Sequence, residues 1–127
     1  PSWSQRIDEA LKDPIPEENV AYTLHFYADT HRQELRDLAE KAIAGGLPIF
    51  VTEYGTTDAS GDGIVNEEQT KIWWKLLDNY KISYCNWSVA DKDEACSVLK
   101  PESSIEDLTK NRKLTTSGRL VKAKLQN

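Results

Sequence analysis

Apolar residues along this chain recur in two patterns, one with the period of a helix and one typical of strands. Helical spacing predicts four helices, over residues 4–13, over 32–44, from Asn66 onward, and from Thr115 or Thr116 to about Gln126. Stretches rich in β-branched and aromatic residues predict three strands, at 19–28, 47–53 and 81–88. Residues 89–111 are largely polar and show no clear period.

Local residue signals indicate where the helices begin and end. Ser4 is expected to cap the first helix, and Gly45-Gly46 is expected to end the second. Asn66 is followed three residues later by Gln69, which is the spacing of a capping box. These signals support the helix boundaries that the apolar pattern predicts.

The same stripes predict which side chains face the core. The inward positions are Leu35, Leu38, Ala39, Ala42 and Ile43 in the second helix, Ile72, Trp73, Leu76 and Leu77 in the third, and Leu120, Val121 and Leu125 in the last. Arg36 falls on the polar side of its helix, Trp74 is expected to be partly exposed, and His31 is expected to be solvated at a helix start. The outer faces should therefore be polar and solvent-facing.

The stretch from Leu47 to Glu53 forms the centre of the predicted sheet. Its short apolar run follows a Gly-Gly-Leu-Pro turn and is typical of a strand buried on both faces. In the preceding strand, a period of two places His25 and Tyr27 on one side and Phe26 on the other. The regular alternation of helices and strands predicts an α/β fold built from βα units around a parallel sheet.

Three strands do not close a barrel, because a barrel of eight parallel strands takes about 250 residues. The chain is therefore either a small three-stranded sandwich or part of a larger fold. Its opening on Pro1-Ser-Trp3 and the two unprotected edges of the sheet favour the second interpretation.

Composition and charge narrow the class of protein. The 127 residues are 39% hydrophobic and 29% charged, which is typical of a folded globular chain. The net charge of −5, without a long run of Lys or Arg, argues against a nucleic-acid partner, and no apolar stretch is long enough to predict a membrane span. Four Trp and five Tyr are many for this length, and aromatic faces serve sugar-binding clefts as well as cores.

Polar and aromatic side chains cluster at the predicted strand ends. They are His25 and Tyr27 on the first strand, Glu53 on the second, and Asn86 and Trp87 on the third. Because the carboxyl ends of parallel strands are where α/β folds place their chemistry, Glu53 is a candidate catalytic acid. An ordinary strand-end carboxylate that caps the next loop remains the alternative.

The segments YTLHFYA, IFVTEYGTT and NWSVADKDEACSVL, in this order and spacing, resemble glycoside hydrolase family 5 cellulases, which are retaining endo-β-1,4-glucanases. The resemblance covers nearly the whole chain and leaves only residues 101–113 unmatched. It implies that residues 1–127 are the C-terminal part of the catalytic domain. The implied fold is the C-terminal portion of a (β/α)8 TIM barrel, strands six to eight with their helices.

The resemblance also implies roles for residues in two groups. Glu53 matches the catalytic nucleophile, Tyr27 matches a tyrosine that hydrogen-bonds to it, and His25 matches a histidine that lines the active site. Substrate-binding positions are implied at Trp87, which stacks under a sugar, at Lys92 and Glu94, which bind hydroxyls, and at Ala59, in a loop that borders the same subsites. Family members commonly have a cis peptide after the tryptophan, so Trp87–Ser88 is expected to be cis.

One family element is missing from the sequence. The family's proton donor is a Glu in an Asn-Glu-Pro sequence, and no Asn-Glu-Pro occurs here. We therefore expect this chain to supply the nucleophile but not the acid, and to be inactive alone. It should dock against the missing N-terminal barrel half or self-associate. The resemblance further implies a β-1,4-glucan substrate, a secreted enzyme and no cofactor.

Residues 58–69 support a competing interpretation. Asp58, Ser60 and Asp62, followed by Gly63, resemble the start of a twelve-residue calcium loop, although Gln69 stands where a bidentate Glu is required. The other interpretation is a Gly-rich turn that leads into the next helix. A calcium-binding or carbohydrate-binding structural module without catalysis is therefore the alternative function.

Two cysteines leave one further alternative open. In a secreted cellulase, Cys85 and Cys96 can form a disulfide that tethers the loop carrying Lys92 and Glu94. Cys85 can equally be a small buried residue with a free thiol.

Overall fold

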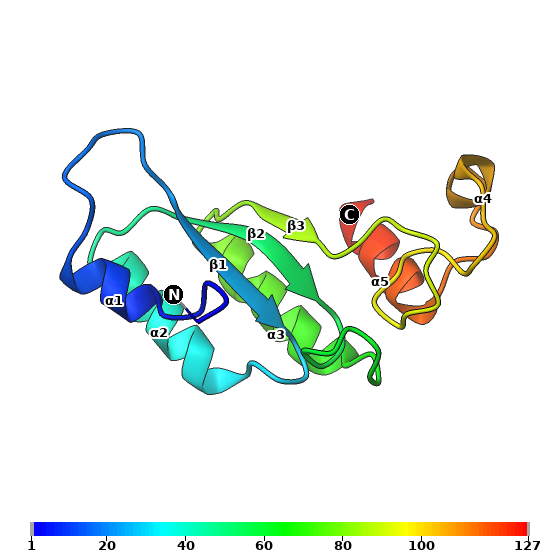
Figure 1. The fold of residues 1–127 in the computed structure, drawn as a ribbon, viewed down its shortest axis with the longest axis horizontal. Helices are drawn as coiled ribbons and strands as arrows, with labels where there is room; N and C mark the ends of the chain where they lie inside the picture. Colours follow the sequence, from blue (N-terminus) through cyan, green and yellow to red (C-terminus); the bar gives the residue numbers. More distant parts are fainter. Residues whose placement is uncertain (1, 127) are drawn as a thin grey trace.

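Three parallel strands form a sheet in the order β1-β2-β3, and helices cover one of its faces (Figure 1). The structure is a computed structural model that describes residues 2–126. Its elements are α1 (Ile7–Lys12), β1 (Tyr22–Tyr27), α2 (Gln33–Ala44), β2 (Ile49–Gly55), α3 (Glu67–Asn79), β3 (Tyr84–Asn86), α4 (Ile105–Thr109) and α5 (Thr116–Leu125). None of the helices within the described range is both long and apolar enough to cross a bilayer.

The predicted parallel sheet is confirmed, and its register brings the strand ends together. His25 lies beside Glu53 across β1 and β2, and Tyr54 lies beside Asn86 across β2 and β3. Because all three strands run the same way, their carboxyl ends share one edge of the sheet. The side chains that the sequence singled out therefore gather along this edge.

The main core lies between the sheet and helices α2 and α3. Phe26 of β1 stacks on Trp73 of α3 with ring centroids 4.0 Å apart, and Val51 of β2 is fully buried beside them. Phe50, on the other face of β2, is 37% exposed. The prediction that this strand is buried on both faces is wrong for the described residues, because helices pack against only one side of the sheet.

The predicted range of helix α2 is confirmed, but the prediction that Arg36 lies on the polar, solvent-facing side of this helix is wrong. Arg36 is 4% exposed, and its guanidinium lies 5.5 Å from the centre of the Trp73 ring and donates to the side chains of Gln33 and Gln69. The capping box at α3 is therefore half formed, since Asn66 accepts from the Gln69 N–H but the Gln69 side chain turns to Arg36. A cation can be buried here because an aromatic face and amide oxygens replace its water.

Several other helix positions differ from prediction. Trp74 is 4% exposed rather than partly exposed, because its ring packs edge-on against Tyr54. Ile72 and Leu125, which were expected to face inward, are 38% and 76% exposed. The stripes are thus rotated slightly from those that the apolar pattern predicts.

The cap predicted at Ser4 is wrong, the cap predicted at Thr115 is confirmed, and one short helix was not predicted. Ser4 does not cap α1, because Ser4 lies in the left-handed region with a φ of 60° and the helix begins at Ile7. Thr115 caps α5 as predicted, with Oγ1 accepting from the Gly118 N–H at 2.9 Å. Helix α4 was not predicted, although its Ser104 cap is followed three residues later by the acidic Asp107.

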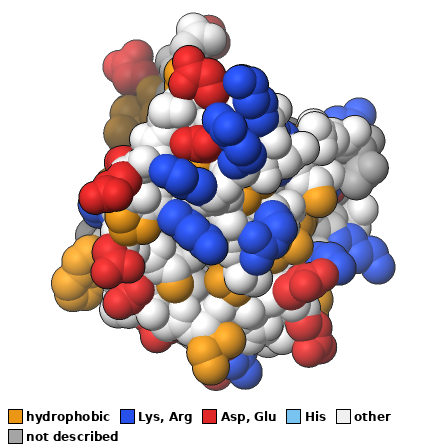
Figure 2. All heavy atoms as spheres, turned by 90° about the vertical axis from the view of Figure 1, so that its right-hand side faces the viewer, with side chains coloured by type: hydrophobic (Ala, Val, Ile, Leu, Met, Phe, Trp, Pro, Cys, Tyr) orange, Lys and Arg blue, Asp and Glu red, His pale blue; other side chains and the backbone are white. Residues whose placement is uncertain are grey.

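Basic side chains gather at the end of the molecule that holds α4 and α5 (Figure 2). Near α4, the basic residues Arg112 and Lys113 form ion pairs with Asp107. The Ser104 backbone N–H, together with these cations, holds the pKa of Asp107 below its ordinary value. This cluster therefore helps to fix the short helix α4, which the hydrophobic pattern alone does not reveal.

The two cysteines are not joined in this structure. Cys85 is exposed on β3, and Cys96 is buried in the loop that follows, so both are free. The interpretation of Cys85 as a buried apolar residue is therefore wrong, and the disulfide alternative is not observed. The Cys96 thiol instead lies 2.9 Å from the Thr57 hydroxyl, which fastens this loop to the end of β2.

Candidate active site

Glu53 lies where β2 nears its carboxyl end, and its carboxylate is held by β1. The Tyr27 hydroxyl donates to Oε1 at 2.8 Å, and Nδ1 of His25 lies 3.7 Å from Oε2. All three side chains are part-buried. The neighbouring strands thus present a carboxylate with one oxygen in a hydrogen bond and the other beside an imidazole.

Tyr27 acts as a fixed hydrogen-bond donor to Glu53 in this arrangement. Burial and the hydrogen bond to Glu53 raise the pKa of its phenol well above the ordinary value, so the group stays protonated at neutral pH. Gly55 lets the ring lie against β2, because a Cβ there would overlap Cδ1 and Cε1 of Tyr27. The absence of a side chain at Gly55 therefore helps to set the position of the phenol.

His25 is oriented from its other ring nitrogen. Its Nε2 lies 2.8 Å from the Thr52 hydroxyl, which in turn lies 2.8 Å from the Thr23 hydroxyl. A hydroxyl can both donate and accept, so this contact satisfies either tautomer of the imidazole. The ring is thereby held with Nδ1 toward Glu53.

An open hollow of about 740 Å³ surrounds the Glu53 carboxylate. It is lined by Trp3, Ser4, Gln5, His25, Tyr27, His31, Glu53 and Ala59. Four of the predicted site residues are thus brought together in one cavity. The N-terminal lining residues were missed because the sequence interpretation placed Ser4 and Gln5 in a helix.

Trp87, Lys92 and Glu94 form a second group beyond the end of β3. Trp87 is 40% exposed, and Nζ of Lys92 lies 5.8 Å from the centre of its ring. The Lys92 ammonium also donates to Oε2 of Glu94 at 2.9 Å. The Trp87–Ser88 peptide is cis, as expected. An exposed aromatic face beside a charged pair suits the binding of a sugar ring and its hydroxyls.

The loop at residues 58–65 uses its acidic side chains to fold a turn. Oδ1 of Asp58 accepts from the backbone N–H of Ser60 at 2.8 Å, and Oδ1 of Asp62 accepts from the Ala95 N–H at 3.0 Å. Residues 2–126 contain no group of three or more His, Cys, Asp or Glu side chains placed to hold a metal ion. These contacts favour the Gly-rich turn over the calcium loop.

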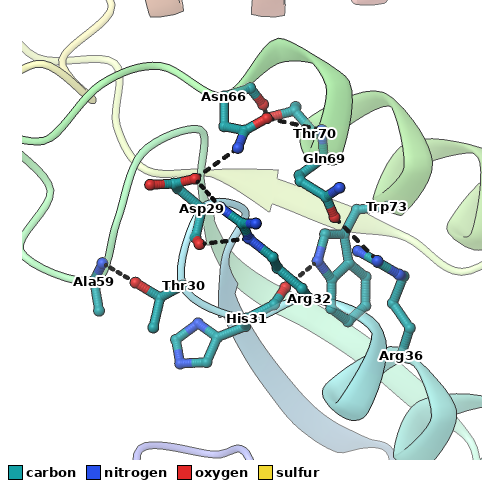
Figure 3. Close-up of polar contacts among 10 residues, drawn as sticks. All are labelled: Asp29, Thr30, His31, Arg32, Arg36, Ala59, Asn66, Gln69, Thr70 and Trp73. Atoms are coloured by element: carbon teal, nitrogen blue, oxygen red, sulfur yellow. Dashed lines mark hydrogen bonds and ion pairs between the residues drawn. The ribbon is translucent and has the colours of Figure 1, made fainter.

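The turn between β1 and α2 joins the turn after β2 through a polar clasp, formed by Asp29, Thr30, Ala59 and Asn66 (Figure 3). Oδ1 of Asp29 accepts from Nδ2 of Asn66 at 2.6 Å, and Oγ1 of Thr30 accepts from the Ala59 N–H at 2.9 Å. The hydrogen bonds from Asn66 and Arg32 lower the pKa of Asp29, so its carboxylate stays charged. The clasp holds Ala59 at the rim of the hollow.

His31 was expected to be solvated, but it is half-buried and lines the hollow. Its Nδ1 accepts from the backbone N–H of Tyr27 at 2.8 Å. The signal that could have revealed it is its position, four residues after Tyr27 in the turn that follows a strand end.

Comparisons with known proteins agree with this geometry. Residues 1–93 match the family model described as cellulase, glycosyl hydrolase family 5. Endoglucanase Z of Dickeya dadantii is 45% identical over 127 residues, which are all of this chain and 28% of that protein. The chain therefore spans little more than a quarter of the length of this relative.

Solved structures of cellulases are also similar to this chain. A cellulase structure superposes with a TM-score of 0.90 at 46% identity, over all of this chain and 39% of that one. The catalytic domain of a Thermobifida fusca endoglucanase, solved with cellotetraose, superposes with a TM-score of 0.83 at 28% identity, over 94% of this chain and 39% of that one. The parallel sheet described here therefore corresponds to a part of the barrel in these cellulases. Together with the match over residues 1–93, this shows that the chain belongs to the cellulase family, glycosyl hydrolase family 5.

Proposed function

We propose that residues 1–127 are the C-terminal part of the catalytic domain of a retaining endo-β-1,4-glucanase. Strands β1, β2 and β3 are the sixth, seventh and eighth strands of its (β/α)8 barrel. The substrate is cellulose or a related β-glucan. Because such polymers do not cross membranes, we further propose that the enzyme is secreted.

The observation that carries this proposal is the Glu53 carboxylate, bonded by Tyr27 at 2.8 Å and facing a hollow at the carboxyl edge of a parallel sheet. A retaining glycosidase needs a carboxylate that is ionised, oriented and reachable by the sugar. The phenol of Tyr27 supplies orientation, because it stays protonated and can only donate to Glu53. His25 limits the remaining freedom of the carboxylate from the other side.

In the first step of the proposed reaction, a carboxylate oxygen of Glu53 attacks the anomeric carbon. The bond from this carbon to the glycosidic oxygen breaks, and the departing oxygen takes a proton from a general acid. In the second step, water gives its proton to the same group and attacks the anomeric carbon, which releases Glu53. Two inversions at one carbon give net retention.

The general acid is proposed to lie outside these 127 residues. Retaining enzymes place their two carboxyl groups about 5–5.5 Å apart, and the sequence contains no Asn-Glu-Pro to supply the second. Within the described sheet no strand pairs with the outer edge of β1 or of β3, and Phe50 is partly exposed on the uncovered face of the sheet. We propose that the rest of the barrel covers these surfaces, and that the isolated chain associates with itself instead.

Trp87 is proposed to stack under the sugar next to the scissile bond. Lys92 and Glu94 are proposed to bind sugar hydroxyls further along the non-reducing side, and Ala59 borders the same subsites. The 40% exposure of Trp87 leaves a ring face open for stacking. The Lys92–Glu94 pair at 2.9 Å offers both a donor and acceptors to hydroxyls. In this proposal the reaction takes place at Glu53, and the sugar-binding surface lies beyond the end of β3.

The test is Glu53→Gln in the intact enzyme, measured on carboxymethylcellulose and by calorimetry with cellotetraose. We expect kcat to fall by at least about 10³-fold, because the amide cannot attack, while oligosaccharide binding persists. Glu67→Gln on the exposed face of α3 is the matched control and should stay active. Near-normal turnover in Glu53→Gln would refute the proposal, and binding without hydrolysis by the wild type would favour a carbohydrate-binding module.

A further inference from the structure

His31 takes part in three hydrogen bonds, one through its imidazole ring and two through its backbone. The ring Nδ1 accepts from the Tyr27 backbone N–H at 2.8 Å, and the backbone N–H of His31 donates to the Tyr27 carbonyl at 2.8 Å. Its carbonyl accepts from Nε1 of Trp73 at 2.7 Å. The residue is therefore fixed both to the strand that carries Tyr27 and to helix α3.

These contacts determine the protonation of the imidazole. Because Nδ1 accepts a backbone hydrogen bond, the proton of the neutral ring must lie on Nε2. Burial lowers the pKa of His31, which favours this neutral form. Among residues 2–126, no acceptor hydrogen-bonds to Nε2.

The free donor belongs to a residue at the Glu53 hollow. His31 is one of the residues that line it. In Figure 3 the imidazole points away from α3 and from Trp73. The clasp itself keeps this turn in place, since Asp29 bonds to Asn66 and Thr30 bonds to Ala59.

We propose that His31 is a further substrate-binding residue of this site, and that its Nε2–H donates a hydrogen bond to a hydroxyl oxygen of a neutral glucan in the hollow. Its Nδ1 at the same time positions the main chain of Tyr27, and through it the phenol on Glu53. This proposal rests on the proposed function. A neutral donor suits an uncharged sugar hydroxyl and offers no ion pair to a uronic acid.

Two substitutions separate these roles in the intact enzyme. His31→Asn places an amide oxygen near the position of Nδ1, so the Tyr27 N–H keeps an acceptor, but it removes the donor at Nε2. We expect KM for cellooligosaccharides to rise about 3–10-fold, the worth of one neutral hydrogen bond, with kcat within about twofold. His31→Ala removes both contacts and should lower kcat as well. Lys41→Ala, on the exposed side of α2, is the control.

A second readout does not depend on any substitution at His31. In the Glu53→Gln enzyme, the ¹⁵N spectrum of His31 should show the Nε2–H tautomer, and the Nε2 resonance should move when cellotetraose is added. An unchanged resonance at saturating cellotetraose, or an unchanged KM in His31→Asn, would overturn the role of His31. If the wild-type enzyme neither binds nor hydrolyses glucan, the proposed function itself fails.

Discussion

Gly55→Ala should disturb the active site through a single added methyl group. The new Cβ would overlap two carbons of the Tyr27 ring and lie 2.9 Å from Sγ of Cys96. Cys96 is fully buried and lies 2.9 Å from the Thr57 hydroxyl, so its sulfur has little room to move away from the new methyl group. The Tyr27 ring is half-buried and is the part that must move.

The size of the effect follows from these contacts. To regain ordinary carbon–carbon contact at about 3.5 Å, the ring must withdraw by about 1 Å. The 2.8 Å hydrogen bond from Tyr27 to Glu53 then stretches beyond hydrogen-bonding distance. Overpacking of this kind costs about 1–3 kcal/mol of unfolding free energy, and a misplacement of about 1 Å at a reacting group costs about 10²-fold in rate.

The assay combines thermal or denaturant unfolding with glucanase kinetics on the intact enzyme. Gly46→Ala is the matched control, because a Cβ at Gly46 meets no atom within 4 Å, while its φ of +84° still disfavours alanine. Gly46→Ala should lose about 1 kcal/mol of stability through its backbone, with unchanged kcat. Gly55→Ala should lose both stability and kcat.

A Gly55→Ala enzyme with the kcat of the wild type would contradict this prediction. The Tyr27 phenol would then not depend on the bare backbone of β2. A loss of stability alone, equal to that of Gly46→Ala, would likewise remove the link between Gly55 and the orientation of Glu53.

Two further predictions concern stability. Thr115→Ala should lower the unfolding free energy by about 1 kcal/mol, because the Gly118 N–H at the start of α5 loses its acceptor; Thr115→Ser should restore most of it in denaturant unfolding, and an unchanged midpoint in the alanine variant would contradict the cap. His31 has a folded-state pKa below its ordinary 6.5, so its contribution is complete above about pH 6.5 and is lost as the pH falls toward the folded value. Unfolding free energy measured from pH 7 to pH 5 should therefore decline less in His31→Asn than in the wild type, and parallel curves would count against a buried neutral imidazole.

Much of the sheet could be predicted because its signals are local. The alternation in β1 places Phe26 inward and His25 outward, and the Gly45 stop and Thr115 cap mark helix ends where the structure has them. The wrong predictions concern side chains whose burial depends on contacts with another helix or strand. Arg36 is buried because Trp73 and Gln69 meet it from another helix, which no periodicity within α2 can reveal.

In the candidate site, too, the residues on strands could be predicted and those in turns and irregular segments could not. The strand register alone brings Glu53 beside His25, so these two residues could be paired from the order of the elements. His31 and Trp3 could not be found in this way, because they reach the hollow through a turn and an irregular segment with no repeating pattern. The chemical groups on regular elements were predictable, whereas those placed by loops needed the structure.

The most direct test of Glu53 as nucleophile is to trap the covalent intermediate. The intact enzyme would be incubated with a 2-deoxy-2-fluoro-β-cellobioside that carries a good leaving group, then digested and analysed by mass spectrometry. We expect one added fluorocellobiosyl group, attached to the peptide at Glu53, together with time-dependent loss of activity. Labelling of a different carboxylate, or rapid hydrolysis of cellulose by an enzyme that lacks the Glu53 carboxylate, would contradict it.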